Sequence, residues 1–265
     1  MWPAALLLCL PAQAAPPAQA VAQGLRVALR LSGGAEPWAA LHFTMEPGWH
    51  LYWTTPGDSG LAPEVRWELP EGWSAGPLEH PLPLPLPSEE GVDYAHAGNF
   101  TLLARLHQPP GRPATGKVTA RLDWLACRES CVRGEATLGA TFGDSRTALG
   151  PKDLTAALGL LPLKSMTGLK PGPATVRTDG NRWLIEVPLL GPEASRADAF
   201  FPEALPDFTV VHREVRVEGG LLRVPVLPAG PASRLHSLRG VLRVGGQGLA
   251  LELPLPAAPA GARQP

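Results

Sequence analysis

The sequence lacks the features that mark several common classes of protein. Its net charge is −1 and it contains no run of basic residues, so it offers no electrostatic surface for nucleic acid or an anionic membrane. Beyond the N-terminal segment, no stretch approaches the roughly 18 to 20 consecutive apolar residues that a membrane-spanning helix needs. We therefore expect a protein that binds no nucleic acid and does not itself span a membrane.

Cysteine and methionine are also scarce, with three residues of each. The chain has no second closely spaced cysteine pair, and its seven histidines show no metal-ligand spacing, so a zinc site is not expected. Two thiolates are suitable ligands for copper(I), although the shortage of methionine disfavours such a site. We predict no cofactor and no metal, and keep a copper(I)-handling or protein-binding module as an alternative function.

The N-terminal segment has the features of a secretory signal peptide. Residues 4–10 are apolar and are followed by two Ala-Gln-Ala motifs, which fit small-residue cleavage sites. We predict a signal peptide over residues 1–20, although no basic residue precedes the apolar run. Cys9 lies inside this segment, which leaves Cys127 and Cys131 as the cysteines of the exported protein.

Cys127 and Cys131 are the most informative residues because they lie so close together. A disulfide across so short a loop constrains the unfolded chain by only about 2 kcal/mol, which favours a reactive over a stabilising role. Residues four apart in a straight strand are separated by about 13 Å, whereas bonded cysteines keep their Cα atoms within about 7 Å. A disulfide therefore requires a turn over the polar residues 128–130. Arg128 and Arg133 bring positive charge near both sulfurs and favour the reactive thiolate.

The pattern of apolar residues is that of a β protein. Proline (32 residues) and glycine (29 residues) punctuate short alternating runs and do not cluster in one tract. Residues 117–124 and 135–142 alternate apolar with polar side chains, as strands with one buried face do. These two runs flank the cysteine turn, so we predict a hairpin with both cysteines at or near its tip.

Further short runs extend this pattern to an all-β prediction. Strands are predicted over 25–31, 41–45, 49–53, 64–69, 100–106, 174–177, 183–187, 208–217, 221–226 and 240–253. A short helix over 153–161 interrupts them. We expect a sandwich domain over 21–149, a linker over 150–170, a second, smaller β-sandwich-like domain over 171–255 and a tail over 256–265.

Several other segments have ordinary structural interpretations. The alternating prolines within 81–87 are expected to make a rigid edge crossing, with partner binding as the alternative. Ser59 lies in a glycine-containing segment that is expected to form a tight turn. Five aromatic residues are expected in the sandwich core, with a ligand groove as the alternative: Trp49, Tyr52, Trp53, Trp67 and Trp73.

Four motifs occur in a fixed order along the first domain. They are GWHLYWTTPGDSGLAP at 48–63, WELPEG at 67–72, GVDY at 91–94, and WLAC at 124–127 with Cys131 and ATL after it. Their order and spacing resemble the periplasmic N-terminal domain of DsbD-type thiol:disulfide interchange proteins, especially the suppressor-of-copper-sensitivity (ScsB-like) branch. The phrase AFFP at 199–202 extends the resemblance to roughly residues 22–255.

The resemblance implies a periplasmic protein with an immunoglobulin-like sandwich and a cysteine pair that cycles between disulfide and dithiol. It implies electron transfer from a membrane donor of the DsbD or CcdA type to thioredoxin-like periplasmic proteins, which makes the chain a protein-disulfide reductase component. In this family Cys131 corresponds to the cysteine that forms mixed disulfides, and Cys127 to the one that resolves them. The two cysteines lie closer together here than in the best-known members, which leaves this division of roles open.

The resemblance also implies a cap loop around Asp93 and Tyr94, whose aromatic side chain would shield the disulfide until a partner displaces it. Covering the sulfurs would prevent exchange with unintended disulfides, because exchange needs thiolate attack on an accessible sulfur. A solvated acidic loop with one packed tyrosine is the alternative.

Full-length members of the family also carry a transmembrane electron carrier and a terminal thioredoxin-like domain. Neither is found in this sequence, so we expect a separate membrane protein to supply electrons. A non-catalytic sandwich with a structural disulfide is the remaining alternative.

Overall fold

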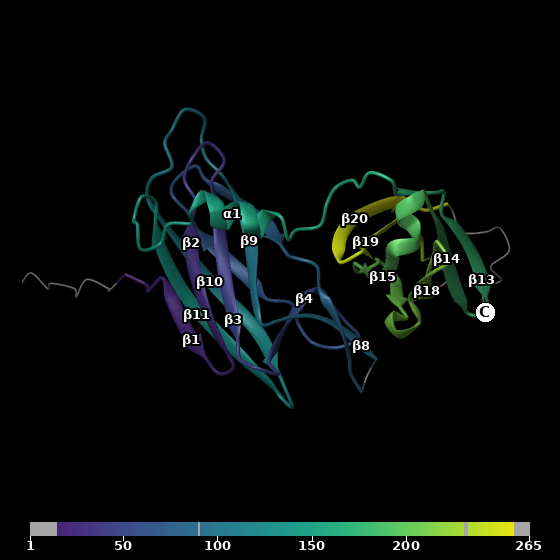
Figure 1. Ribbon diagram of the computed structural model, residues 1–265. Coiled ribbons are helices and arrows are strands. Elements are labelled where there is room, and N and C mark those ends of the chain that lie inside the picture. The colour runs from purple at the N-terminus through teal and green to yellow at the C-terminus, as the bar shows by residue number, and fades with distance from the viewer. Residues whose placement is uncertain (1–14, 90, 231–232, 257–265) are drawn as a thin grey trace, which may run out of the picture.

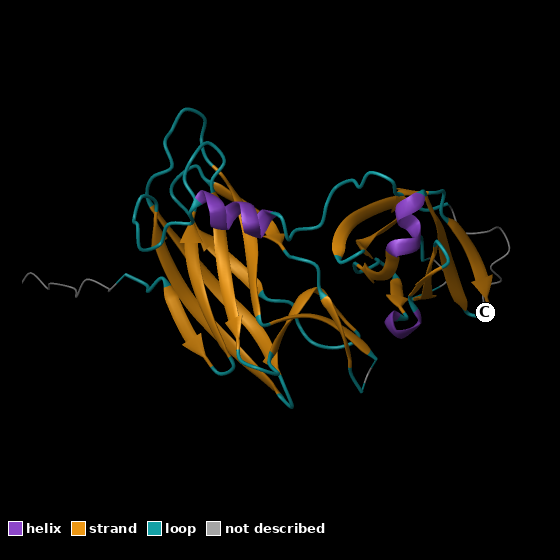
Figure 2. Ribbon diagram, in the orientation of Figure 1, coloured by secondary structure: helices purple, strands orange, loops and turns teal. Residues whose placement is uncertain are grey.

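The computed structural model describes residues 15–89, 91–230 and 233–256 (Figure 1). These residues are mostly strands, with few helical turns (Figure 2), so the predicted all-β class is confirmed. Most of the predicted signal peptide (1–14) and most of the predicted tail (257–265) lie outside the described residues. Within the described part of the chain, no helix is long and apolar enough to cross a membrane.

Strands β1 to β11 form two sheets, which we call the N-terminal sandwich. One sheet has the order β1-β2-β3-β9-β6, with β1 at Gln19–Ala22, β2 at Leu25–Leu31, β3 at Trp38–Met45, β9 at Asn99–His107 and β6 at Ser74–Glu79. The other has the order β11-β10-β4-β8-β7, with β11 at Cys131–Thr141, β10 at Lys117–Cys127, β4 at His50–Gly57, β8 at Val92–Ala97 and β7 at Leu84–Pro87. Strand β5 at Glu64–Glu68 pairs with β10. The first residues of β1 fall within the predicted signal peptide.

Alternating side chains build the core between these two sheets. In β2 every second residue is buried, and in β10 the buried residues include Val118, Ala120 and Leu122. They pack in one cluster with residues of the opposite sheet, where the rings of Phe43 and Phe100 stack with centroids 5.1 Å apart. The alternation of apolar and polar residues in the sequence therefore corresponds to one buried face on each strand.

The proline-rich segment and the predicted helix both lie at the margins of the sandwich. Strand β7 contains two of the alternating prolines and is the last strand of its sheet, a position that tolerates residues without a backbone N–H. Helix α1 spans Pro151–Leu158 and begins at a proline, whose fixed φ suits the first helical turn. Leu154 and Ala157 pack against a small cluster that includes Leu103 of β9.

Strands β12 to β20 form a second body, which we call the C-terminal unit. One sheet has the order β12-β14-β18-β16, with β12 at Lys170–Pro171, β14 at Arg182–Leu190, β18 at Leu221–Pro228 and β16 at Phe208–Val210. Strands β13 at Thr175–Asp179 and β17 at Arg216–Glu218 extend it, and 3-10 turns lie at Pro192–Arg196 and His212–Glu214. The other sheet has the order β15-β19-β20, with β15 at Ala197–Pro202, β19 at Ser237–Val244 and β20 at Gln247–Pro254.

Two predicted strands of the C-terminal unit differ from the structure. Residues 208–217 are interrupted by the 3-10 turn at His212–Glu214. Residues 240–253 form parts of two strands, because Gly245 and Gly246 both adopt positive φ and reverse the chain between β19 and β20. An apolar pattern alone does not reveal such interruptions.

The two bodies lie side by side and meet at an apolar junction (Figure 1). Trp53 and Tyr94 of the N-terminal sandwich pack with Phe201 and Val241 of the C-terminal unit, and all four side chains are buried. We call this cluster the domain junction. Strands β4 and β8, which carry Trp53 and Tyr94, therefore contact the C-terminal unit directly.

Candidate functional site

Cys127 and Cys131 form a disulfide at the tip of the β10–β11 hairpin. They are directly opposite each other in the register, with Cα atoms 4.0 Å apart. Between them the Arg128 N–H donates to the Ser130 carbonyl oxygen at 3.2 Å and closes the turn. The predicted hairpin and turn are thus confirmed. Cys127 is buried, with 3% of its surface exposed, whereas Cys131 is exposed.

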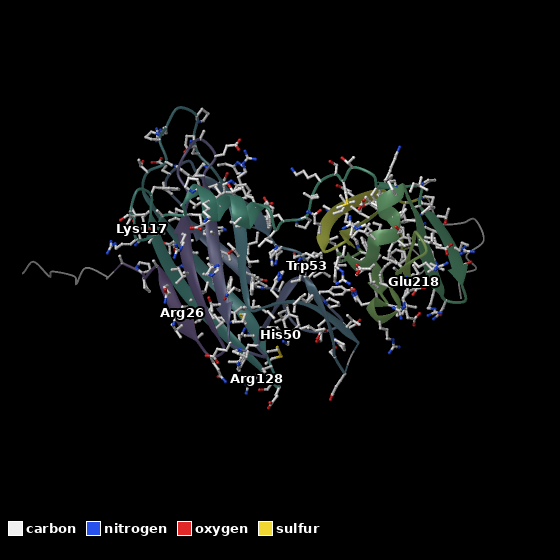
Figure 3. The ribbon with its side chains drawn as sticks, in the orientation of Figure 1. Arg26, His50, Trp53, Lys117, Arg128 and Glu218 are labelled. Atoms are coloured by element: carbon white, nitrogen blue, oxygen red, sulfur yellow. A yellow bond between two sulfur atoms is a disulfide. The ribbon has the colours of Figure 1, made fainter. Side chains whose placement is uncertain are left out.

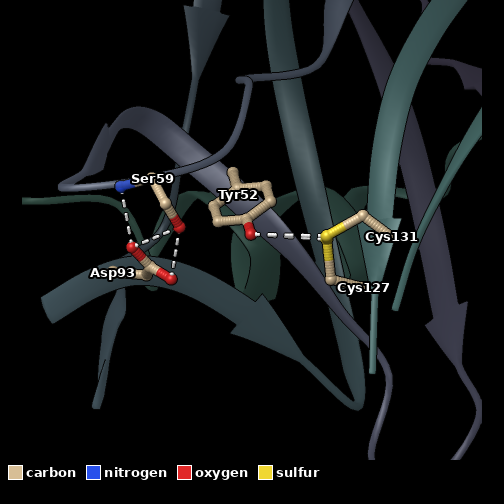
Figure 4. Close-up of a disulfide and its surroundings, with 5 residues drawn as sticks. All are labelled: Tyr52, Ser59, Asp93, Cys127 and Cys131. Carbon is tan, nitrogen blue, oxygen red and sulfur yellow. Dashed lines mark hydrogen bonds between the residues drawn. A yellow bond between two sulfur atoms is a disulfide. The ribbon is translucent and has the colours of Figure 1, made fainter. Parts of the chain in front are cut away.

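Tyr52 of β4 lies against the disulfide (Figure 4). Its hydroxyl donates a hydrogen bond to Cys127 Sγ at 3.3 Å and lies 3.9 Å from Cys131 Sγ. Strand β4 comes here because His50 pairs with Cys127 at the end of β10. The Tyr52 phenol therefore contacts the buried sulfur with a polar group.

The Tyr52 ring is held from two sides. The His50 ring lies nearly perpendicular to it, at a centroid distance of 5.4 Å. On another side the chain at Gly60 passes so close that a Cβ atom there would overlap the ring. Gly60 also has φ of +88°, so glycine suits this position both sterically and conformationally.

Asp93 fixes the turn that covers Tyr52. One carboxylate oxygen accepts hydrogen bonds from both the Ser59 N–H and the Ser59 hydroxyl, each at 2.9 Å. The Val92 N–H donates in turn to the Asp58 carboxylate at 2.8 Å. The predicted tight turn at Ser59 is therefore tied to β8, and Figure 4 shows Tyr52 between this turn and the disulfide.

Two charged or titratable side chains complete the surroundings of the disulfide. The Arg128 guanidinium lies over the Trp49 ring, 5.6 Å from its centroid, at the hairpin tip labelled in Figure 3. Burial lowers the pKa of His50 below its usual value, and the negative charge of Asp93 opposes this effect. A lowered pKa favours a neutral His50 ring at pH 7.

Tyr94 occupies a different environment from Tyr52. Its ring lies in the domain junction, with centroids 5.2 Å from Phe201 and 5.1 Å from His212. Its hydroxyl and His212 Nδ1 are 3.2 Å apart. Burial raises the pKa of Tyr94 above its usual value, and the charge of Asp58 adds to this effect. The tyrosine whose hydroxyl contacts the disulfide is Tyr52, whereas the Tyr94 hydroxyl contacts His212. The cap role of Tyr94 therefore stays a prediction.

Reasoning from the sequence placed Tyr52 among core aromatic residues and missed its contact with the sulfur. Tyr52 is indeed buried, but it lies on the same strand face as His50, and Leu51 between them faces the sandwich core. Strand alternation could have separated these two faces. It could not have shown which face meets the cysteines.

Among the described residues, no group of three or more His, Cys, Asp or Glu side chains is arranged to hold a metal ion. Two histidines, His80 and His96, do lie together in the sandwich, with ring nitrogens 3.2 Å apart. Both are buried, and burial lowers their pKa values to about 4 and about 3 respectively.

The fold and the site together define a β-sandwich domain with a partly exposed disulfide at a hairpin tip. Residues 17–142 match the family model described as the N-terminal domain of the thiol:disulfide interchange protein DsbD, and this part of the chain is a DsbD-type N-terminal domain. No curated protein matches the sequence significantly.

The whole fold is similar to a solved structure, the N-terminal periplasmic domain of ScsB from Proteus mirabilis. The TM-score is 0.68, the sequence identity is 14%, and the match covers 89% of this chain and 95% of that one. The similarity therefore extends through the C-terminal unit as well as the sandwich, and at this identity it concerns the fold.

Proposed function

We propose that this chain is a periplasmic thiol:disulfide exchange protein, the protein-disulfide reductase component of an electron relay. Its Cys127–Cys131 couple accepts electrons from a separate membrane partner of the DsbD or CcdA type and passes them to oxidised thioredoxin-like proteins. One observation carries this proposal: a hairpin-tip disulfide that joins an exposed residue, Cys131, to a buried one, Cys127, whose sulfur accepts a hydrogen bond from Tyr52.

The difference in exposure between Cys131 and Cys127 suggests the order of the chemical steps. A donor thiolate attacks Cys131 Sγ, the Cys127–Cys131 bond breaks, and Cys127 leaves as a thiolate. A second donor thiol then displaces Cys131 and leaves the donor oxidised and this chain as a dithiol. Two electrons and two protons are gained in total.

The output steps run in the opposite direction. The Cys131 thiolate attacks a substrate disulfide and forms a mixed disulfide, with one substrate sulfur leaving as a thiol. The Cys127 thiolate then attacks Cys131 Sγ, releases the reduced substrate and restores the disulfide. Burial of Cys127 fits this second role, because a resolving thiol needs to reach only its neighbour.

Tyr52 is suited to stabilise the charge that forms on Cys127 in the reductive direction. A hydrogen bond to an ionised acceptor is about twice as strong as one between neutral groups. The Tyr52 hydroxyl already lies 3.3 Å from Cys127 Sγ in the disulfide form, so little movement is needed to solvate the leaving thiolate. Such a bond lowers the thiol pKa and makes Cys127 a better leaving group.

Trapping of a mixed disulfide tests the assignment of the two cysteines. The probe is a single-cysteine thioredoxin activated as its thionitrobenzoate mixed disulfide, so that each attack releases a coloured thiolate. Reduced Cys127→Ser is expected to form a stable conjugate, whereas the wild type forms the conjugate and then resolves it. The matched variant Cys131→Ser is expected to react at least tenfold more slowly, and equal rates would contradict the assignment.

A further inference from the structure

Strand β11 is the outermost strand of its sheet, and it ends at the reactive cysteine. One side of β11 pairs with β10 along its whole length, from the Lys117–Thr141 pair to the Cys127–Cys131 pair. Within the described residues, no strand of the sheet pairs with the other side. Figure 1 shows the two strands as a long hairpin that reaches the lower tip of the sandwich.

The hydrogen-bond phase of this hairpin determines which groups point outward. The Phe142 N–H donates to the Gly116 carbonyl oxygen at 3.0 Å, at the end of the hairpin away from the disulfide. In an antiparallel pair, bonded and non-bonded residue pairs alternate. Even-numbered residues of β11 are therefore bonded to β10, and the odd-numbered ones direct their N–H and C=O groups away from it. Those nearest the disulfide all have exposed side chains: Cys131, Arg133, Glu135 and Thr137.

The chain itself already uses part of this edge. Further along β11, the Gly139 N–H donates to the Pro17 carbonyl oxygen at 2.8 Å. Gly139 is odd-numbered, so this bond confirms that the odd residues face outward. The bond to Pro17 shows that an outward N–H of this edge is able to pair with another segment, and residues 131–137 continue the same edge to the disulfide.

The register of this edge suits disulfide chemistry. Cys131 directs its own N–H and C=O outward, so the residue opposite it in an added antiparallel strand belongs to a hydrogen-bonded pair. The Cα atoms of such a pair are about 5.5 Å apart, within the range of about 4.4 to 6.8 Å that disulfides span. Paired side chains project from the same face of a sheet, so a cysteine at that position faces Cys131 Sγ.

We propose that residues 131–137 of β11 are a docking edge for an extended, cysteine-bearing segment of the exchange partner. The segment adds to the sheet as an antiparallel strand, with its reacting cysteine opposite Cys131. Backbone pairing is independent of side-chain identity, so this edge recognises the extended conformation of a partner more than its sequence. The proposal rests on the proposed exchange function and names how that site selects its partners.

The electron balance of the docked reaction is that of ordinary exchange. The Cys131 thiolate attacks the cysteine sulfur of the segment, a new Cys131–segment disulfide forms, and the former partner sulfur leaves with the electron pair. Cys127 then attacks Cys131 Sγ and releases the segment as a thiol. The segment is reduced and the Cys127–Cys131 couple is oxidised.

A proline and alanine pair of variants at Glu135 tests the docking edge. Glu135→Pro removes an outward N–H without removing a bond to β10, because Glu135 belongs to a non-bonded pair with Asp123. Glu135→Ala removes the same carboxylate and keeps the N–H. The probe is a synthetic seven-residue Thr/Val-rich peptide with a central cysteine, activated as the thionitrobenzoate mixed disulfide.

The reduced proline variant is expected to react with this peptide at least tenfold more slowly than the alanine variant. Both variants should react alike with 5,5′-dithiobis(2-nitrobenzoate), a small activated disulfide that cannot pair with a strand. Equal peptide rates for the two folded variants would overturn the docking proposal.

A second measurement uses the unaltered protein and does not depend on variant folding. The same peptide is prepared with N-methyl groups on the amides that would face β11. Wild type is expected to react at least tenfold more slowly with the methylated peptide, and equal rates would overturn the docking edge alone. A reduced wild type that reacts with neither peptide nor 5,5′-dithiobis(2-nitrobenzoate) would overturn the exchange function, and the docking proposal with it.

Discussion

The two tyrosines of the sequence lie on opposite faces of the same strand pair, β4 and β8, and they do different things. Both are almost fully buried, at 3% and 2% exposure. Tyr52 donates its hydroxyl to the sulfur of Cys127, 75 residues away, whereas the Tyr94 hydroxyl meets His212, 118 residues away. Burial alone therefore does not assign a role to a tyrosine. The role of each tyrosine depends on which residue the fold brings next to its hydroxyl.

The two faces also differ in what surrounds the tyrosines. The face of Tyr52 is polar, with the Asp93 carboxylate, the Ser59 turn and the disulfide nearby (Figure 4). The face of Tyr94 is apolar, with Trp53 and Phe201 packed on its ring. We expect changes on the first face to alter thiol chemistry, and changes on the second to alter stability.

At neutral pH the largest effect is expected at the domain junction. Tyr94→Ala removes a buried ring and leaves a cavity, for which aromatic-to-alanine changes cost about 3 to 5 kcal/mol. Denaturant unfolding should show this loss, with Tyr94→Phe as the control that keeps the ring and loses only about 1 kcal/mol. If Tyr94→Ala were as stable as Tyr94→Phe, the ring would not be packed at the junction as described.

The next effect is a loss of stability in acid, caused by His80 and by His96, which lies on the same face of β8 as Tyr94. The folded protein holds His80 and His96 neutral, with pKa values of about 4 and about 3. The unfolded chain has a histidine pKa of about 6.5, so it binds protons that the folded chain does not. The free energy of unfolding should therefore be level above about pH 7 and fall from about pH 6.5 to about pH 4.

The slope of this loss can reach about 1.4 kcal/mol per pH unit for each histidine. Urea unfolding at several pH values measures it. His80→Gln keeps a hydrogen-bonding side chain that does not titrate, and it should flatten the slope relative to wild type. An unchanged slope in His80→Gln would show that other groups cause the acid sensitivity.

A smaller effect is expected from Tyr52→Phe, and it should appear in chemistry more than in stability. Losing a charge-assisted bond of about 1.5 to 3 kcal/mol raises the Cys127 thiol pKa by roughly one to two units in the reduced protein. Absorbance titration of the thiolate in a Cys131→Ser background measures this pKa. A Cys127 pKa equal to that of the parent variant would mean that Tyr52 does not stabilise the thiolate.

The smallest effect is expected from Ser59→Ala. This change removes the hydroxyl bonds to Asp93 but keeps the backbone N–H bond, so it should cost about 1 kcal/mol in unfolding experiments. Because this change leaves Gly60 against the Tyr52 ring and keeps the Tyr52 hydroxyl, the Cys127 pKa should rise by less than in Tyr52→Phe. If Ser59→Ala raised the Cys127 pKa more than Tyr52→Phe does, the Ser59–Asp93 contact would matter more to the thiol than the Tyr52 hydrogen bond, contrary to this account.

The cysteine hairpin could be predicted from the sequence because its determinants are local. Alternation over residues 117–124 and 135–142, with a polar turn between them, specifies a hairpin whatever the rest of the chain does. The contacts of Tyr52 and Tyr94 could not be predicted in this way. They depend on β4 pairing with β10 and on β8 meeting the C-terminal unit, and both are long-range events.

Two strand interruptions had local signals that the prediction did not use. The adjacent Gly245 and Gly246 form the turn between β19 and β20, and such a pair is typical of a hairpin. The turn at His212–Glu214 interrupts the predicted strand over 208–217 at three polar residues, and His212 there contacts Tyr94 of the N-terminal sandwich. The start of α1 at Pro151 is a similar case, since a helix-start signal was present two residues before the predicted start.

The reduction potential of the Cys127–Cys131 couple tests the central claim most directly. Purified protein is equilibrated with glutathione or dithiothreitol buffers and its free thiols are counted. The exchange function predicts a potential between roughly −180 and −270 mV, the range of known exchange proteins. A potential below about −300 mV would identify a structural disulfide and contradict the proposed function.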